Sequence, residues 1–200
     1  MSLTTLIEDS RSAIDADPAK AAAGFTVTGQ LVGTTEVAVN ARGHTLTVDE
    51  PRALGGTNLG ANPVEHALIA LASCQAITYR FWAVKLGIEL DSVEVVAVGD
   101  LDVRGFFGFD GDVRPGFTAI RLTVTPTGPE PVERYRQLAD AVDAHCPVLD
   151  LLRNATPIER TIAVTDQGRL RAVPELVFDE SAPEVQPPQP AEIETRSPGS

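Results

Sequence analysis

Residues 62–87 read NPVEHALIALASCQAITYRFWAVKLG and decide the fold, because they predict one long helix with clear signals at both ends. Asn62 can cap the first turn, Pro63 is favoured at the first helical position, and Gly87 is typical of a helix C-terminus. The residues between them are apolar nearly all round the helix, which is the pattern of a helix in the core rather than on the surface. Cys74 lies midway along it.

Segments of alternating polar and apolar residues lie on both sides of this helix. Before it, residues 25–32, 35–41 and 44–48 alternate with period two and are separated by turns that contain glycine, which predicts an antiparallel meander. After it, residues 93–103 and 117–126 alternate in the same way. Strands and helices do not alternate strictly, so the chain is predicted to be an α+β protein with an antiparallel sheet and a long buried central helix.

The rest of the chain is predicted from helical spacing, turn residues and composition. Helices are expected at 3–14, 18–24, 131–144 and 146–152, loops at 49–63 and 104–116, and a last strand at 158–164. The C-terminal end is rich in Pro and Glu and has almost nothing to bury, which predicts disorder. The chain thus divides into an N-terminal helical extension (1–24), a folded domain (25–179) and a disordered tail (180–200).

Charge and hydropathy exclude several classes of function. The chain has 16 Lys and Arg against 28 Asp and Glu, a net charge of −12, and no basic run, so nucleic-acid binding is not expected. Polar residues interrupt the longest apolar region, 67–86, so no membrane-spanning segment is expected. The N-terminus lacks the basic start and apolar core of a secretory signal. The protein is therefore expected to be cytoplasmic.

The two cysteines are the main candidates for chemistry. Burial of Cys74 as a small apolar side chain is the plain alternative to a chemical role. Cys146 precedes Pro147 at the start of a helix, where free N–H groups and the helix dipole favour the thiolate and lower the pKa. If both helices pack on the same sheet and the sulfurs face each other, the pair can cycle between dithiol and disulfide.

Peroxide reduction needs such a pair of thiols. One thiolate attacks the O–O bond and becomes a sulfenic acid, and the second condenses with it to a disulfide. The apolar surroundings of Cys74, with Phe106, Phe107, Phe109 and the nearby Phe117, suit an organic hydroperoxide better than hydrogen peroxide; packing in the core or at a dimer interface is the alternative for these rings. No CxxC or HxxxH spacing exists, so neither a metal site nor a cofactor is expected.

Three stretches around these cysteines form a family pattern. Asn62-Pro63-Val64-Glu65 leads through Ala-Leu-Ala-Ser to Cys74, His145-Cys146-Pro147-Val148 follows in the second half, and Pro51-Arg52-Ala53-Leu54-Gly55-Gly56 precedes the helix. From about residue 24 to 165 the chain resembles the OsmC/Ohr family of osmotically inducible and organic hydroperoxide resistance proteins. The resemblance implies the OsmC-like fold for the domain at 25–179, with a second cysteine-bearing helix.

The same resemblance implies a partner, a reaction and a reductant. It implies an intertwined homodimer with two sites at the subunit boundary. It implies thiol peroxidase activity in which Cys74 attacks the organic hydroperoxide and Cys146 resolves the intermediate. Electrons are implied to come from a dithiol reductant of the dihydrolipoyl type.

The sequence departs from the family's best-studied peroxidases at two positions. Their Glu directly after Asn-Pro is Val64 here, with Glu65 one residue later and about 100° further round the helix. Their loop between the first two strands carries an Arg over the thiolate, and residues 33–36 here contain none. Glu65 remains a candidate catalytic residue, and Arg52 or Arg42 is a candidate replacement for the cation.

The departures leave two functions open besides a dimer with inert thiols. The first is a thiol peroxidase acting on organic hydroperoxides through Cys74 and Cys146. The second is a catalytically weak protein of the same fold that binds a small molecule in a Phe-lined cavity or senses redox state.

Overall fold

The computed structural model describes residues 1–166 and 169–172, which belong to two compact units. The first unit comprises residues 1–156 and holds both cysteines, and the second contains the described residues 157–166 and 169–172. In the second unit, β6 (Ala163–Asp166) and β7 (Arg169–Ala172) pair as an antiparallel hairpin. The predicted disordered tail, 180–200, lies outside the described residues.

The N-terminal part of the first unit begins with a helix. In α1 (Leu3–Ala16) the Ser2 side chain accepts a hydrogen bond from the Thr5 N–H, and the turn η1 (Pro18–Ala21) follows. The predicted meander is confirmed as a three-stranded antiparallel sheet in the order β1-β2-β3, with strands β1 (Val27–Leu31), β2 (Val37–Ala41) and β3 (His44–Val48). Arg42 and Gly43 both have positive φ, which the tight turn between β2 and β3 requires.

The central helix α2 (Pro63–Leu86) begins and ends where its sequence predicts. The Asn62 Oδ1 accepts from the Glu65 N–H at 2.9 Å, and the Glu65 Oε2 accepts from the Asn62 N–H at 2.8 Å, which forms a capping box. Gly87 ends the helix with a left-handed φ of 58°. The caps therefore fix both helix ends by local interactions alone.

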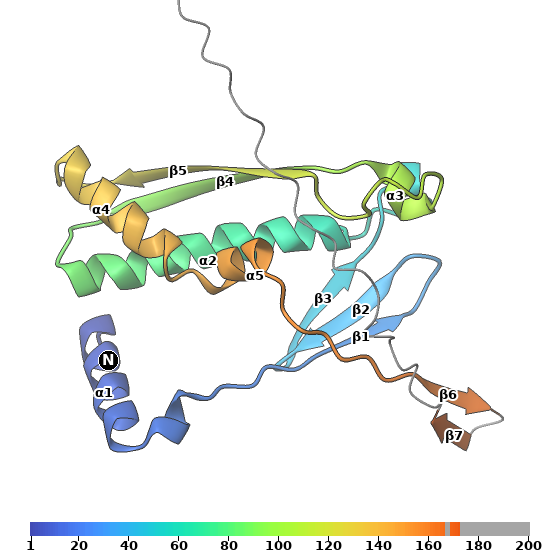
Figure 1. The fold of residues 1–200 in the computed structure, drawn as a ribbon, viewed down its shortest axis with the longest axis horizontal. Helices are drawn as coiled ribbons and strands as arrows, with labels where there is room; N and C mark the ends of the chain where they lie inside the picture. Colours follow the sequence, from blue (N-terminus) through green and yellow to red (C-terminus); the bar gives the residue numbers. More distant parts are fainter. Residues whose placement is uncertain (167–168, 173–200) are drawn as a thin grey trace, which may run out of the picture. The chain divides into compact units, whose positions relative to one another are not determined.

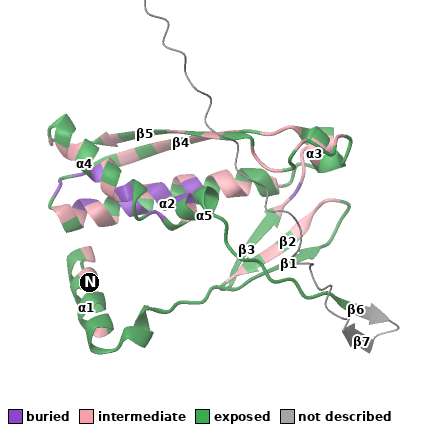
Figure 2. Cartoon of the chain, in the orientation of Figure 1, coloured by how far each residue is buried: buried purple, intermediate pink, exposed green. Residues whose placement is uncertain are grey.

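Only one face of α2 is buried in the single chain (Figure 2). That face consists of Leu71, Gln75, Thr78, Tyr79 and Ala83. On the opposite side Ile69 is 50% exposed and Ile77 is 59% exposed. The expectation of a fully buried core helix thus holds for one face only, because the strands and helices that contact α2 pack against that face.

By length and composition α2 also qualifies as a helix that can cross a membrane, contrary to the expectation from its interrupting polar residues. The core helix of a globular protein meets the same criterion, and 28% of the qualifying stretch is buried inside this chain. Its buried face includes Gln75 and Thr78.

The buried face of α2 packs against a two-stranded sheet and two helices (Figure 1). The strands pair antiparallel, and intermediate and exposed residues alternate along both. The largest core cluster lies between α2 and α4 and consists of Tyr79, Ala83, Ile88, Leu90, Leu138 and Val142. The elements are β4 (Ser92–Asp100), β5 (Ala119–Thr127), α4 (Val132–Asp143) and α5 (Pro147–Arg153).

The structure corrects three details of the predicted architecture. The described strands form three separate antiparallel sheets, of three, two and two strands, rather than one. The predicted loop at 104–116 contains part of a short helix, α3 (Val103–Phe107), because Asp102 caps it and Gly108 ends it in a left-handed conformation. The last strand begins at Ala163 rather than 158, since it pairs only where β7 lies opposite.

A buried carboxylate holds the loop that leads into α2. Asp49, at the end of β3, is 1% exposed and accepts five hydrogen bonds, which come from Thr35, Glu50, Thr57 and Leu59. The hydroxyl groups of Thr35 and Thr57 hold the pKa of Asp49 well below its usual range, against the opposing effect of burial. One side chain thus connects the β1–β2 turn, the end of β3 and the loop before α2.

Candidate active site

The two cysteine side chains meet where α2 contacts α5. Cys146 is the N-cap residue of α5 and is 1% exposed. Cys74, on α2, is half-buried and packs against the apolar cluster formed by Leu71, Cys146 and Leu149. Both cysteines are free thiols. The structure therefore brings together the pair that the sequence singles out, 72 positions apart in the chain.

The pKa of the Cys146 thiol is raised, and burial is the largest cause. A hydrogen bond from the Leu149 N–H lowers this pKa, and so, to a smaller extent, does one from the Thr78 hydroxyl. The neighbouring Cys74 thiol raises it further. The expectation that a helix start lowers this pKa is therefore wrong. The side chain is almost wholly removed from water, and desolvation of the thiolate outweighs the backbone N–H groups.

The raised pKa predicts slow alkylation of Cys146 at neutral pH. In a Cys74→Ser variant, which has Cys146 as its one thiol, the rate of reaction with iodoacetamide should rise with a midpoint pH above that of the same variant in denaturant, where the pKa is about 8.5. Burial still favours the neutral thiol in the variant, so the sign of the shift is unchanged. A folded-state midpoint at or below the denatured one would contradict this assignment.

A cleft of about 830 Å³ borders the cysteine cluster. Four residues, Leu71, Ile120, Leu122 and Leu149, belong both to the wall of the cleft and to the cluster around the thiols. The polar side chains of the wall include Gln75, Tyr79, Arg114 and the ion pair between Arg153 and Asp143, whose N···O distance is 3.3 Å. The volume and the mixture of apolar walls with few polar groups are typical of a small-molecule site.

The three clustered phenylalanines lie outside this cleft. Phe106, Phe107 and Phe109 are 64%, 46% and 76% exposed. The Phe107 ring stacks on Phe109 and meets Phe106 edge to face, with ring centroids 5.1 Å apart in each pair. Phe117, two residues before β5, is the member of the predicted aromatic group that lines the cleft. The predicted cavity lined by Phe106, Phe107 and Phe109 is therefore not formed by the described part of the single chain.

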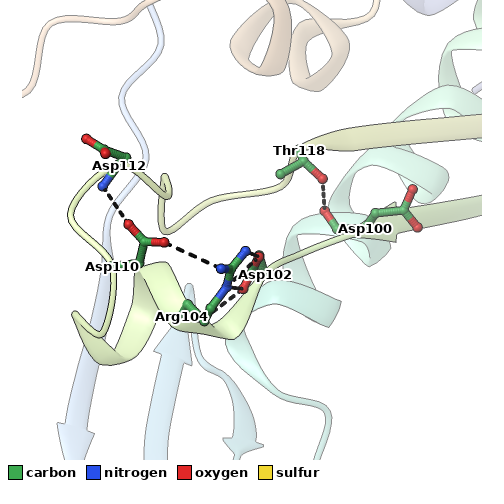
Figure 3. A network of polar contacts seen from close by, with 6 residues as sticks. All are labelled: Asp100, Asp102, Arg104, Asp110, Asp112 and Thr118. Atoms are coloured by element: carbon green, nitrogen blue, oxygen red, sulfur yellow. Dashed lines mark hydrogen bonds and ion pairs between the residues drawn. The ribbon is translucent and has the colours of Figure 1, made fainter.

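A polar network holds the segment that carries these rings (Figure 3). The Arg104 guanidinium pairs with Asp102 at 2.6 Å and with Asp110 at 3.4 Å. The Asp112 N–H donates to Asp110, and the Thr118 N–H and hydroxyl donate to the Asp100 carbonyl. The pKa of Asp102 is lowered chiefly by its hydrogen bonds from Arg104. The contacts of Arg104 and Asp110 thus hold residues 102–112 together, and the bonds from Thr118 to Asp100 join the two ends of the segment.

The three candidate replacements for the family's charged residues lie elsewhere, and Arg42 lies exposed in the turn between β2 and β3. The Glu65 carboxylate caps α2 and lies nine residues before Cys74, about 13 Å along the helix axis. Arg52 lies exposed in the turn η2 (Arg52–Leu54), and its guanidinium makes no ion pair with any residue that the structure describes. None of the three belongs to the cysteine cluster or the cleft wall.

Sequence reasoning did not single out the polar groups that do line the cleft. Arg114 and Arg153 carry no motif that separates them from surface charges. Gln75 carries a weak signal, since it is a polar residue directly after Cys74 on an apolar helix. No group of three or more His, Cys, Asp or Glu side chains is placed to hold a metal ion within residues 1–166 and 169–172.

Three solved structures illustrate what this fold is similar to. An OsmC-like protein from Mycoplasma pneumoniae matches with a TM-score of 0.57 at 20% identity, over 66% of this chain and 88% of that one. An organic hydroperoxide resistance protein OsmC from Legionella pneumophila matches with a TM-score of 0.51 at 22% identity, over 66% of this chain and 90% of that one. An organic hydroperoxide resistance protein from Elizabethkingia anophelis, with thiocyanate bound, matches with a TM-score of 0.52 at 18% identity, over 66% of this chain and 89% of that one. At these identities the likeness establishes the fold alone.

The sequence itself matches a family model. No curated protein matches the chain. The model of the OsmC-like proteins matches residues 56–161, which is more than half of the chain and spans both cysteines. The α+β arrangement of antiparallel sheets and helices agrees with the OsmC-like fold. The chain therefore belongs to the OsmC-like protein family, which includes the organic hydroperoxide resistance proteins.

Proposed function

We propose that this protein is a thiol peroxidase that reduces organic hydroperoxides with Cys74 and Cys146. The observation that carries the proposal is the meeting of the two free thiols in one apolar cluster beside a cleft of ligand size. The cleft is walled mainly by aliphatic and aromatic side chains, which suit an alkyl or aryl peroxide. Some relatives of the fold are named organic hydroperoxide resistance proteins, which agrees with this substrate class.

The cycle has three steps. The Cys74 thiolate attacks the peroxide, so that an S–O bond forms as the O–O bond breaks; Cys74 becomes a sulfenic acid and the alkoxide leaves and takes up a proton. Cys146 then attacks the sulfenic sulfur, water leaves, and a disulfide forms. An external dithiol of the lipoyl type exchanges with this disulfide, becomes oxidised itself, and returns both cysteines to thiols.

Burial and pKa support Cys74 as the attacking residue. Cys146 is almost fully buried and burial raises its pKa, so it meets an incoming peroxide poorly and is mostly neutral at pH 7. Cys74 is only half-buried. A buried thiol that reacts second is adequate for resolution, because its partner sulfur lies in the same cluster.

Steady-state consumption of cumene hydroperoxide with dihydrolipoic acid as reductant tests the proposal. Turnover that saturates with hydroperoxide supports the peroxidase. A second candidate, a small-molecule-binding or redox-sensing protein of the same fold, is favoured by the positions of Glu65 and Arg52, neither of which lines the cleft beside the thiols. No turnover, together with retained binding of cumyl alcohol in the cleft, would favour that second function.

We also propose a homodimer, because two apolar surfaces are uncovered in the single chain. Cross-strand partners place Val27, Leu31 and Leu46 on one face of the β1–β3 sheet, and they are 62%, 63% and 48% exposed. The outward face of α2 adds Ile69 and Ile77. Apolar surfaces of this kind are typical of subunit interfaces.

Light scattering should therefore give a particle of twice the chain mass of 21.2 kDa at micromolar concentration. Leu31→Glu places a charge on the apolar sheet face and should shift the particle toward the monomer. Gln30→Glu, one residue away on the opposite face, is the matched control and should stay dimeric. A monomeric wild-type protein would rule the dimer out.

A further inference from the structure

We infer that Gln75 binds the substrate, and that its side-chain amide donates a hydrogen bond to an oxygen atom of the ligand in the cleft. This inference rests on the proposed function, because it takes the ligand to be the organic hydroperoxide. Two observations lead to it. Gln75 is 1% exposed and forms part of the cleft wall, and its Nε2 is buried without a hydrogen-bond partner among the residues that the structure describes.

An unpartnered buried amide is unfavourable for the fold. Burial removes the N–H groups from water, and the great majority of buried polar side-chain atoms in folded proteins have a partner. An apolar side chain of similar size would fill the same space without this cost. A polar group retained at such a place, in the wall of a cleft, therefore points to a hydrogen-bond acceptor that arrives with a ligand.

The position of Gln75 on α2 suits this role. Leu71 lies one turn before it and Tyr79 one turn after it, and all three residues line the cleft. Cys74 is the adjacent residue, packed in the cluster that shares Leu71 and Leu149 with the cleft. A ligand whose apolar body contacts these leucines would thus have its polar end near both the amide and the thiols.

Among the charged groups of the wall, the Arg153 guanidinium is already paired with Asp143. Arg114 belongs to the exposed loop before β5 rather than to α2. Gln75 is therefore the buried donor nearest in sequence to the attacking cysteine. When the O–O bond breaks, negative charge develops on the departing oxygen, and a fixed N–H donor stabilises it more than it stabilises the bound substrate.

Gln75→Met provides the test, because Met has a similar length and volume but no amide. The melting temperature should stay the same or rise, since an unsatisfied polar group is removed. The kcat/KM for cumene hydroperoxide, with dihydrolipoic acid as reductant, should fall by about 10-fold or more. Ser73→Ala, on the exposed side of the same helix and outside the cleft wall, is the control and should change neither quantity strongly.

The outcomes separate this inference from the proposed function. If wild-type turnover is present and Gln75→Met keeps its full kcat/KM, Gln75 does not bind the substrate although the peroxidase stands. If Gln75→Met markedly lowers both the melting temperature and the activity, the amide has a structural role and the inference is overturned. If the wild type has no turnover, calorimetry with cumyl alcohol decides: binding weakened at least 10-fold by Gln75→Met supports the inference, and equal or absent binding overturns it.

Discussion

Changing Cys74 to Ser is expected to abolish consumption of organic hydroperoxide, whereas changing Cys146 to Ser should leave one turnover per subunit. The serine hydroxyl at residue 74 is not ionised near neutral pH and cannot attack the O–O bond as the thiolate does. Without Cys146 the first step still proceeds and stops at a sulfenic acid on Cys74. The asymmetry distinguishes the attacking residue from the resolving one.

Mass spectrometry after trapping with dimedone measures this difference. The Cys146→Ser variant should carry the adduct on Cys74, in an amount equal to the peroxide consumed. Ser73→Ala is the matched control, since Ser73 lies exposed on α2 and its hydroxyl, within the described part of the chain, bonds only to carbonyls of the same helix. An adduct on Cys146 in the Cys74→Ser variant would reverse the two roles.

Changing Asp49 to Asn should have the largest effect on stability of the substitutions considered. The carboxylate accepts five hydrogen bonds, two from threonine hydroxyls and three from backbone N–H groups. An amide has one acceptor oxygen, and its NH₂ group would face donors. We expect the melting temperature at pH 7 to fall by about 5–10 °C.

The same side chain predicts a pH dependence. The fold holds the pKa of Asp49 below its unfolded value of about 3.9, so the stabilisation is present above that pH and is lost as the pH falls toward the folded value. The difference in melting temperature between wild type and Asp49→Asn should therefore shrink below about pH 4. Asp9→Asn, on the exposed surface of α1, is the control. Equal melting temperatures for wild type and Asp49→Asn at pH 7 would contradict this account.

The elements that the sequence predicts well are those with local signals. The Asn62-Pro63 start and the Gly87 end of α2 are set by bonds within a few residues, and so is the Arg42-Gly43 turn. Local sequence was sufficient for these features because each depends on neighbours in the chain. The meeting of Cys74 with Cys146 is different: the residues left it conditional on how the two helices pack, and the family resemblance implied it.

Other features depend on partners that are distant in sequence. Which face of α2 is covered, and how deeply Cys146 is buried, depend on how β4, α4 and α5 pack. The helix-start argument for Cys146 failed because burial is a tertiary property. The bonds to Asp49 reach back to Thr35 and forward to Leu59. The exposure of Phe106, Phe107 and Phe109 follows from the fixed segment around α3, which periodicity did not reveal.

Thiol titration after one equivalent of cumene hydroperoxide tests the central claim most directly. The wild-type protein, assayed in denaturant, should have two free thiols per chain before the reaction and none after it. Peptide mapping should then give a single disulfide that joins Cys74 to Cys146 within one chain, as their shared cluster allows. Two thiols still free after the peroxide, or a disulfide that joins different chains, would contradict a redox cycle of this cysteine pair.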